Sequence, residues 1–153
     1  MDIAIYCVGK LNAHYEPVFQ EYAGRLRHYC RLRVAEVPEP KGKFRNENEK
    51  TARYSQELER HLIGQKYFVF DRKGTMFTSE EFAHWFDLTA SVSRGEVCFV
   101  IGGSEGLSEQ LKAGAAHTIS FSPLTFPHQL FRVLFAEQLY RAFTINAGHP
   151  YHK

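Results

Sequence analysis

The alternation of two kinds of segment constrains the fold of this chain more than any other sequence feature. Five short runs rich in β-branched and other apolar residues are separated by segments with apolar residues at helical spacing. This alternation is typical of a mostly parallel sheet with helices on both faces, so we predict an α/β fold. The strands are expected at Ile3–Val8, Leu32–Val37, Tyr67–Asp71, Val97–Ile101 and Thr118–Phe121, and helices at Glu16–Tyr29, Glu47–Ile63 and Ser79–Val92.

Length and charge limit the class of protein. A chain of 153 residues is expected to form a single domain, here residues 1–153, with its own core. The net charge of +2 is too small to indicate a nucleic-acid binder, but it does not exclude a local basic surface. The first ten residues lack the features of a signal peptide and no segment is long and apolar enough to span a membrane, so a cytoplasmic protein without a membrane partner is expected. The cysteines, Cys7, Cys30 and Cys98, are expected to be buried thiols.

The last predicted helix is apolar on nearly every side. Its Glu137 and Arg141 are four residues apart and are expected to stabilise the helix or the dimer. A helix of this kind is buried from more than one direction, which predicts a homodimer, with a central helix in a monomer as the alternative. Its apolar residues are Leu130, Phe131, Val133, Leu134, Phe135, Ala136, Leu139, Tyr140, Ala142, Phe143 and Ile145.

A charged segment without periodicity, Pro38 to Lys50, separates the second strand from the second helix and is predicted to be a mobile loop. Its cations Lys41, Lys43 and Arg45 are able to contact phosphate. The acidic residues that follow, Glu47 and Glu49, instead favour a solvated loop with no ligand.

The stretch FVIGGSEGL, residues 99–107, breaks an apolar strand at glycines before a helix. Such a turn either presents Ser104 as a nucleophile or presents bare backbone to a cofactor. A Ser-His-acid triad would draw its base from His117, His128, His149 or His152, which all follow in the chain. Neither phosphate-loop motif is matched, and Glu105 disfavours phosphate but suits a cation such as S-adenosylmethionine.

A second unusual stretch, FSPLTFPH, runs from Phe121 to His128 and holds two prolines and two phenylalanines around Thr125. A stiff apolar loop can bind a purine through main-chain hydrogen bonds with little ordering cost. The alternative is a buried connection between a strand and a helix. Pro127 suits the start of the last helix.

FVIGGSEGL and the C-terminal sequence SFSPLTFPHQLFRVLFAEQLYRAFTINAGHPYHK closely resemble the RlmH family of SPOUT-class methyltransferases, and the resemblance extends to the FDRKG turn at Phe70–Gly74. It implies methylation of N3 of a pseudouridine in large-subunit ribosomal RNA with S-adenosylmethionine, a C-terminal trefoil knot and a homodimer. Ser104 is then a turn residue. The cofactor contacts implied are Phe70, Gly102, Phe121, Ser122, Pro123, Leu124, Thr125 and Phe126.

Methyl transfer to this ring nitrogen requires alignment of the two reactants and removal of a proton. The candidates for that proton are His128 and the tail residues His149, Tyr151 and His152, while Arg132, one turn beyond His128, is a candidate to hold a phosphate or an oxyanion. The alternative for the tail is a disordered, solvated end. No metal site is expected. The low net charge favours the assembled ribosome over isolated RNA as substrate. A hydrolase and a cofactor-binding module without activity remain as other functions.

Overall fold

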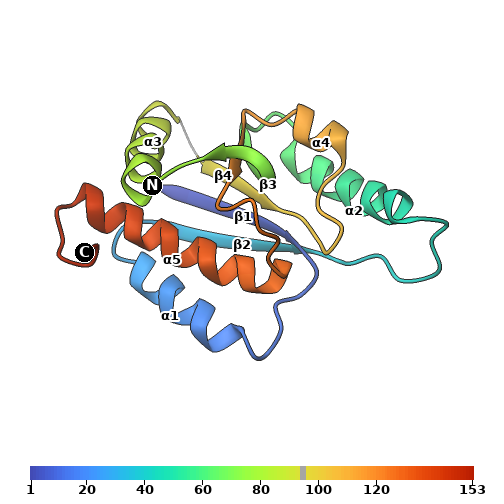
Figure 1. Ribbon diagram of the computed structural model, residues 1–153, viewed down its shortest axis with the longest axis horizontal. Helices are drawn as coiled ribbons and strands as arrows, with labels where there is room; N and C mark the ends of the chain where they lie inside the picture. The colour runs from blue at the N-terminus through green and yellow to red at the C-terminus, as the bar shows by residue number, and fades with distance from the viewer. Residues whose placement is uncertain (94–95) are drawn as a thin grey trace.

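The computed structural model describes residues 1–93 and 96–153 (Figure 1). The five strands form one sheet, in the order β2-β1-β4-β3-β5, and every pairing is parallel. The predicted α/β class is therefore confirmed. The strands are β1 (Asp2–Val8), β2 (Arg31–Val37), β3 (Tyr67–Met76), β4 (Glu96–Ile101) and β5 (His117–Ser120), and the helices are α1 (Glu16–Leu26), α2 (Glu47–Leu62), α3 (Ser79–Val92), α4 (Glu109–Ala113) and α5 (His128–Asn146).

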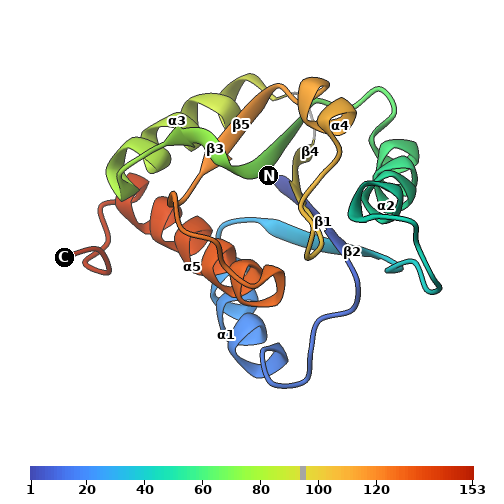
Figure 2. The same ribbon diagram turned by 45° about the vertical axis from the view of Figure 1, so that its right-hand side comes forward.

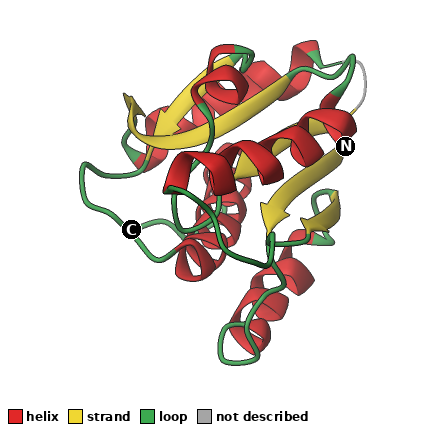
Figure 3. Cartoon of the chain, turned by 90° about the vertical axis from the view of Figure 1, so that its right-hand side faces the viewer, coloured by secondary structure: helices red, strands yellow, loops and turns green. Residues whose placement is uncertain are grey.

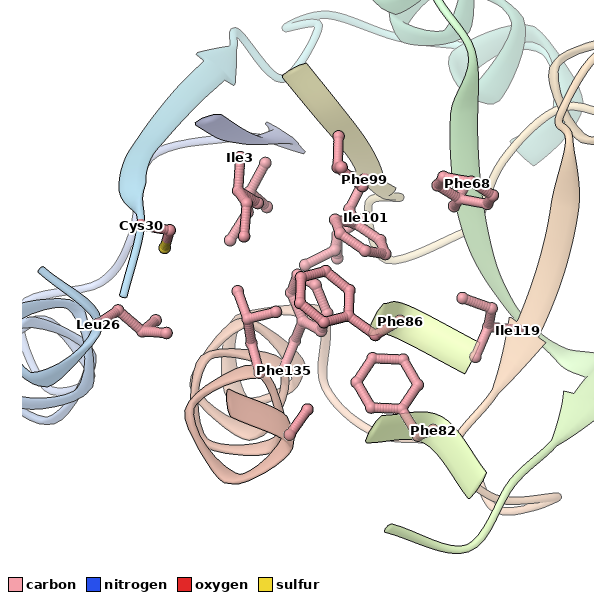
Figure 4. Packing of buried hydrophobic residues seen from close by; sticks show 14 of the residues in the cluster. Ile3, Leu26, Cys30, Phe68, Phe82, Phe86, Phe99, Ile101, Ile119 and Phe135 are labelled. Carbon is pink, nitrogen blue, oxygen red and sulfur yellow. The ribbon is translucent and has the colours of Figure 1, made fainter. Parts of the chain in front are cut away.

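Alternate residues of the strands enter two hydrophobic cores. Ile3 and Ile5 of β1 belong to the core beneath α1, α3 and α5, whereas Ala4 and Tyr6 belong to the core beneath α2 and α4. This is the alternation that a strand covered on both faces requires. Figure 3 shows helices on both sides of the sheet, Figure 2 shows α5 between α1 and α3, and Figure 4 shows the first core, in which Phe99, Phe86 and Phe135 meet.

The third strand is longer than predicted. It was expected to end at Asp71, with FDRKG as a turn, but β3 continues to Met76. The FDRKG segment is a bulge, because Phe70 and Thr75 both pair with Ile119 of β5. Gly74 permits this close return to β5, since a Cβ atom at Gly74 would lie 2.7 Å from the carbonyl oxygen of Thr118.

The last helix is enclosed as expected. From His128 to Ile145 no residue of α5 is exposed, and α5 packs against α1 and α3 as well as the sheet. Glu137 and Arg141 form the predicted i,i+4 ion pair. The enclosing helices belong to the same chain, so the homodimer and the knot stay predictions.

The three cysteines are free and buried, as predicted. Burial raises the pKa of the Cys7 thiol to about 12, so this thiol is protonated at neutral pH. In the described ranges no helix has the length and apolar character needed to cross a membrane.

Candidate functional site

A cleft of about 310 Å³ lies at the carboxyl ends of β3, β4 and β5. In a parallel sheet the carboxyl ends of the strands meet at one edge, which is where α/β folds bind ligands. The walls are the turn at residues 102–106, the loop at residues 121–126 and the start of α5. The lining residues are Phe70, Asp71, Arg72, Ile101, Gly102, Gly103, Ser104, Glu105, Gly106, Ile119, Ser120, Phe121, Ser122, Leu124, Thr125, Phe126, His128 and Phe131.

The turn at residues 102–106, named the glycine turn from here on, presents bare backbone to the cleft. The amide of Gly106 donates to the carbonyl of Gly103 at 3.0 Å, and Gly106 has a φ of +79°, which favours glycine. A Cβ atom at Gly102 would lie 2.5 Å from the carbonyl oxygen of Gly106. Tyr54 of α2 fixes the turn from behind, because its hydroxyl donates to that same oxygen at 2.5 Å.

The geometry around Ser104 does not match a hydrolase. Its hydroxyl donates to the carboxylate of the adjacent Glu105 at 2.6 Å. Among the residues that the structure describes, no histidine forms a hydrogen bond with this hydroxyl, so the Ser-His pair that nucleophilic catalysis needs is not formed. Ser104 therefore acts as a turn residue that holds Glu105.

Glu105 is the charged group of the glycine turn. Burial alone would raise the pKa of its carboxyl, but hydrogen bonds from Ser104 and Lys50 outweigh burial and lower that pKa, so Glu105 is ionised at neutral pH. The ammonium of Lys50 lies 3.2 Å from Glu105 and 2.7 Å from Glu39. Lys50 thus connects the segment before α2 to the wall of the cleft, a connection that local sequence spacing does not reveal.

The opposite wall combines aromatic rings with free backbone. The ring of Phe70 lies 5.3 Å from that of Phe121 and 5.0 Å from that of Phe131, between centroids. The amide of Leu124 donates to the hydroxyl of Ser122 at 3.0 Å, which shapes the loop, while the Leu124 side chain is 71% exposed. The loop therefore lies over the cleft and is not the fully buried connection of the alternative interpretation.

The implied cofactor residues come together here. Phe70, Gly102 and five of the six loop residues line the cleft, while Pro123 is exposed on the same loop. Sequence reasoning missed Asp71 and Arg72, which line the cleft from the bulge of β3. Both residues directly follow a buried strand, and this position was the sequence feature that could have indicated a place at the ligand-binding end of the sheet.

His128 and Arg132 occupy different environments despite their spacing. His128 lines the cleft, and burial together with the charge of Arg132 lowers the pKa of its imidazole, so His128 is neutral at pH 7. Arg132 is only 1% exposed, and its guanidinium donates to the carbonyls of Val8 and Gly9 and to the carboxylate of Glu36. These bonds hold its two terminal nitrogens at the end of β1 and at β2, and the expected contact of Arg132 with a phosphate or an oxyanion stays a prediction.

The tail folds back on the other end of α5. The hydroxyl of Tyr151 donates to Glu137 at 3.1 Å, and the two ring nitrogens of His152 lie 3.1 Å from Arg141 and 2.9 Å from Glu80. These contacts hold the tail beside residues 137–141 of α5, about 14–20 Å along the helix from His128, and none of the described tail residues lines the cleft of its own chain. His149 also lies at this end, 2.7 Å from the hydroxyl of Tyr29.

Comparison with known sequences finds one family over nearly the whole chain. Residues 1–152 match the family described as "Predicted SPOUT methyltransferase". The chain is 42% identical over 164 residues to a protein of Clostridium acetobutylicum and 40% identical over 159 residues to one of Clostridium botulinum strain Okra, with 100% of each chain covered. A protein of Caldicellulosiruptor saccharolyticus is 43% identical over 155 residues, with 99% of each chain covered. All three are named "Ribosomal RNA large subunit methyltransferase H".

Solved structures share the fold at low sequence identity. A probable methylase family protein from Haemophilus influenzae superposes with a TM-score of 0.56 at 12% identity, over 99% of this chain and 70% of the other. TrmJ from Z. mobilis superposes with a TM-score of 0.51 at 16% identity, over 94% and 71% of the two chains. These similarities support the fold assignment.

Proposed function

The chain belongs to the SPOUT methyltransferase family, and on that premise we propose that it transfers a methyl group from S-adenosylmethionine to large-subunit ribosomal RNA. More specifically, we propose N3 of a pseudouridine as the acceptor and the assembled ribosome, in the cytoplasm, as the substrate. The main support for this proposal is the cleft, where the glycine turn and the loop at 121–126 form a site for the cofactor. The reaction itself is proposed from the names of the full-length relatives of this chain.

The cleft fits S-adenosylmethionine in size, backbone and charge. About 310 Å³ lies within the range of small-molecule sites. Gly102 leaves the backbone of the turn uncovered, and the ring of Phe121 provides an apolar surface for a purine. The ionised Glu105 favours a cation. When bound, the cofactor supplies an electrophilic methyl group; Gly102, Phe70 and the loop residues would hold it.

His128 is the residue of this chain best placed to accept the proton of the acceptor nitrogen. It lines the cleft, and its lowered pKa keeps the imidazole neutral, which is the form that accepts a proton. Arg132, packed behind it, positions the start of α5 against β1 through the carbonyls of Val8 and Gly9. We therefore assign His128 a catalytic role and Arg132 a positioning role.

The position of the tail makes a homodimer part of this proposal. The side chains of Tyr151 and His152 bind Glu137, Arg141 and Glu80 and do not line the cleft of their own chain, so in this proposal they serve the cleft of a second copy. In this arrangement each copy contributes a cofactor cleft and a tail. The trefoil knot that the family resemblance implies is compatible with this arrangement and stays a prediction.

The test of this function uses radiolabelled S-adenosylmethionine and ribosomes from cells that lack the enzyme. We expect methyl transfer to the assembled ribosomes and little transfer to deproteinised ribosomal RNA. Comparable transfer to naked RNA would contradict the ribosome as substrate. Binding of S-adenosylmethionine without transfer to either would leave a cofactor-binding module and overturn the methyltransferase proposal.

A further inference from the structure

The segment from Pro38 to Arg53, which joins β2 to α2 and includes the first turns of α2, carries cations near the cleft. Four of them, Lys41, Lys43, Arg45 and Arg53, are exposed. None of these four forms an ion pair within residues 1–93 and 96–153. Positive side chains that the fold leaves available are typical contacts for nucleic-acid phosphates.

The acidic residues of the same segment have structural roles. The carboxylate of Glu49 accepts from the amide of Arg45 at 2.8 Å, while the Asn46 side chain accepts from the amide of Glu49 at 2.9 Å. These two bonds cap α2. Glu47 lies in the first turn of α2, where the helix dipole favours a carboxylate. Glu39 is bound by Lys50. The acids that suggested a merely solvated loop therefore have structural roles and, among the described residues, form no ion pair with the four cations.

The segment is held beside the cleft by one ion-pair bridge and is braced by one internal contact. Lys50 lies between Glu39 and Glu105, and Glu105 lines the cleft. Within the segment, the guanidinium of Arg53 lies 5.7 Å above the ring of Phe44, the one half-buried aromatic residue of the loop. A loop that is already anchored loses less entropy when it binds a ligand.

Sheet topology places these cations at the same edge as the cleft. The strands are parallel, so β2 ends at the edge where β4 leads into the glycine turn (Figure 1). Only β1 lies between β2 and β4. Neighbouring strands lie about 4.8 Å apart, so the ends of β2 and β4 are about 10 Å apart. A polynucleotide with one base in the cleft would pass next to the segment.

From these observations we infer that Lys41, Lys43 and Arg45 bind phosphates of the ribosomal RNA strand that flanks the target nucleotide. This inference rests on the proposed function and names a substrate contact for it. It also explains how a chain with a net charge of only +2 attracts RNA, since the charge that matters is local.

The experiment compares the triple variant K41Q/K43Q/R45Q with a control triple, R27Q/R60Q/K66Q. The control removes the same charge from exposed positions near the amino ends of the strands, opposite the cleft: Arg27 follows α1, Arg60 lies in the last turn of α2 and Lys66 precedes β3. Both variants and the wild type are assayed for methyl transfer to unmethylated ribosomes between low and physiological salt. Affinity for S-adenosylmethionine is measured by calorimetry, and folding by thermal denaturation.

For the K41Q/K43Q/R45Q variant we expect KM for ribosomes to rise about tenfold or more at physiological salt, and the logarithmic salt dependence to fall by about 2 to 3. Its kcat and its affinity for S-adenosylmethionine should stay at wild-type values, as should every property of the control triple.

An unchanged KM, or an equal rise in the control, would overturn the inference while wild-type transfer still supports the proposed function. A raised KM with unchanged salt dependence would also overturn it, because the contact would then be to a ribosomal protein. Absence of transfer by the wild type would remove the proposed function and this inference together.

Discussion

Substitution of Gly102 by alanine tests whether bare backbone forms the wall of the cofactor cleft. The new methyl group would lie 2.5 Å from the carbonyl oxygen and 2.7 Å from the carbonyl carbon of Gly106. Both atoms belong to the backbone, so no rotamer change relieves the clash, and the turn must open by roughly 0.5–1 Å. Overpacking of this kind costs about 1–3 kcal/mol of stability.

The opened turn should also weaken cofactor binding. Loss of one or two main-chain hydrogen bonds, at about 1 kcal/mol each, raises Kd for S-adenosylmethionine about 5- to 30-fold. Calorimetry measures this affinity, and urea denaturation measures the free energy of unfolding. Gly24→Ala is the matched control: nothing lies within 4 Å of its new Cβ, and alanine should stabilise α1 by about 0.5–1 kcal/mol without any change in Kd. A folded Gly102→Ala protein with wild-type affinity would refute the assignment of this backbone to the cofactor site.

Four further substitutions separate structural from catalytic roles. Arg132→Met leaves the carbonyls of Val8 and Gly9 without this donor, so at about 1–3 kcal/mol for each unsatisfied buried group it should lower the free energy of unfolding by about 2–5 kcal/mol, while Glu36 keeps the amide of Leu11; lost transfer at an unchanged Tm would return Arg132 to the substrate site. Tyr54→Phe removes the donor to Gly106 and should cost about 1–3 kcal/mol, measured in urea. Ser104→Ala should retain methyl transfer, and loss of an esterase activity in this variant would revive the hydrolase. The pKa of His128 is lowered, so the folded protein disfavours the charged imidazole. The free energy of unfolding carries no penalty from this group above the unfolded pKa of about 6.5, and it falls as the pH drops below that value. His128→Gln should therefore lose less stability than the wild type between pH 7 and pH 5, and equal losses would contradict the low pKa.

The elements that the sequence predicted correctly are those determined by residues within the element itself, such as an apolar run or a helix cap. In β1 and β4 the apolar runs are long enough to be buried on both faces, and both strands were expected within one residue of their observed bounds. α3 has the predicted bounds, because Thr78 and Glu81 form a capping box at its start. The glycine turn was likewise expected, since glycines after a buried strand restrict what can follow.

Features that depend on distant partners were not predictable in this way. Arg132 is four residues from His128, yet its partners Val8, Gly9 and Glu36 lie about a hundred residues earlier in the chain. Because α5 is apolar on nearly every side, no polar stripe indicated where this guanidinium points.

The bulge of β3 depends on pairing with β5, and the role of Lys50 depends on the approach of α2 to the glycine turn. The tail shows the same limitation: its residue types suggested a substrate site, but only the fold shows that α5 separates the tail from the cleft of its own chain. Contacts between elements, rather than the elements themselves, therefore required the structure.

The most direct measurement of the central claim is identification of the nucleoside that this chain methylates. Unmethylated ribosomes are incubated with the protein and labelled S-adenosylmethionine, and the large-subunit RNA is digested and analysed by mass spectrometry. We predict a single labelled nucleoside, a pseudouridine methylated at N3. Label in another nucleoside would contradict the acceptor, and absence of label with a folded, cofactor-binding protein would contradict the methyltransferase function.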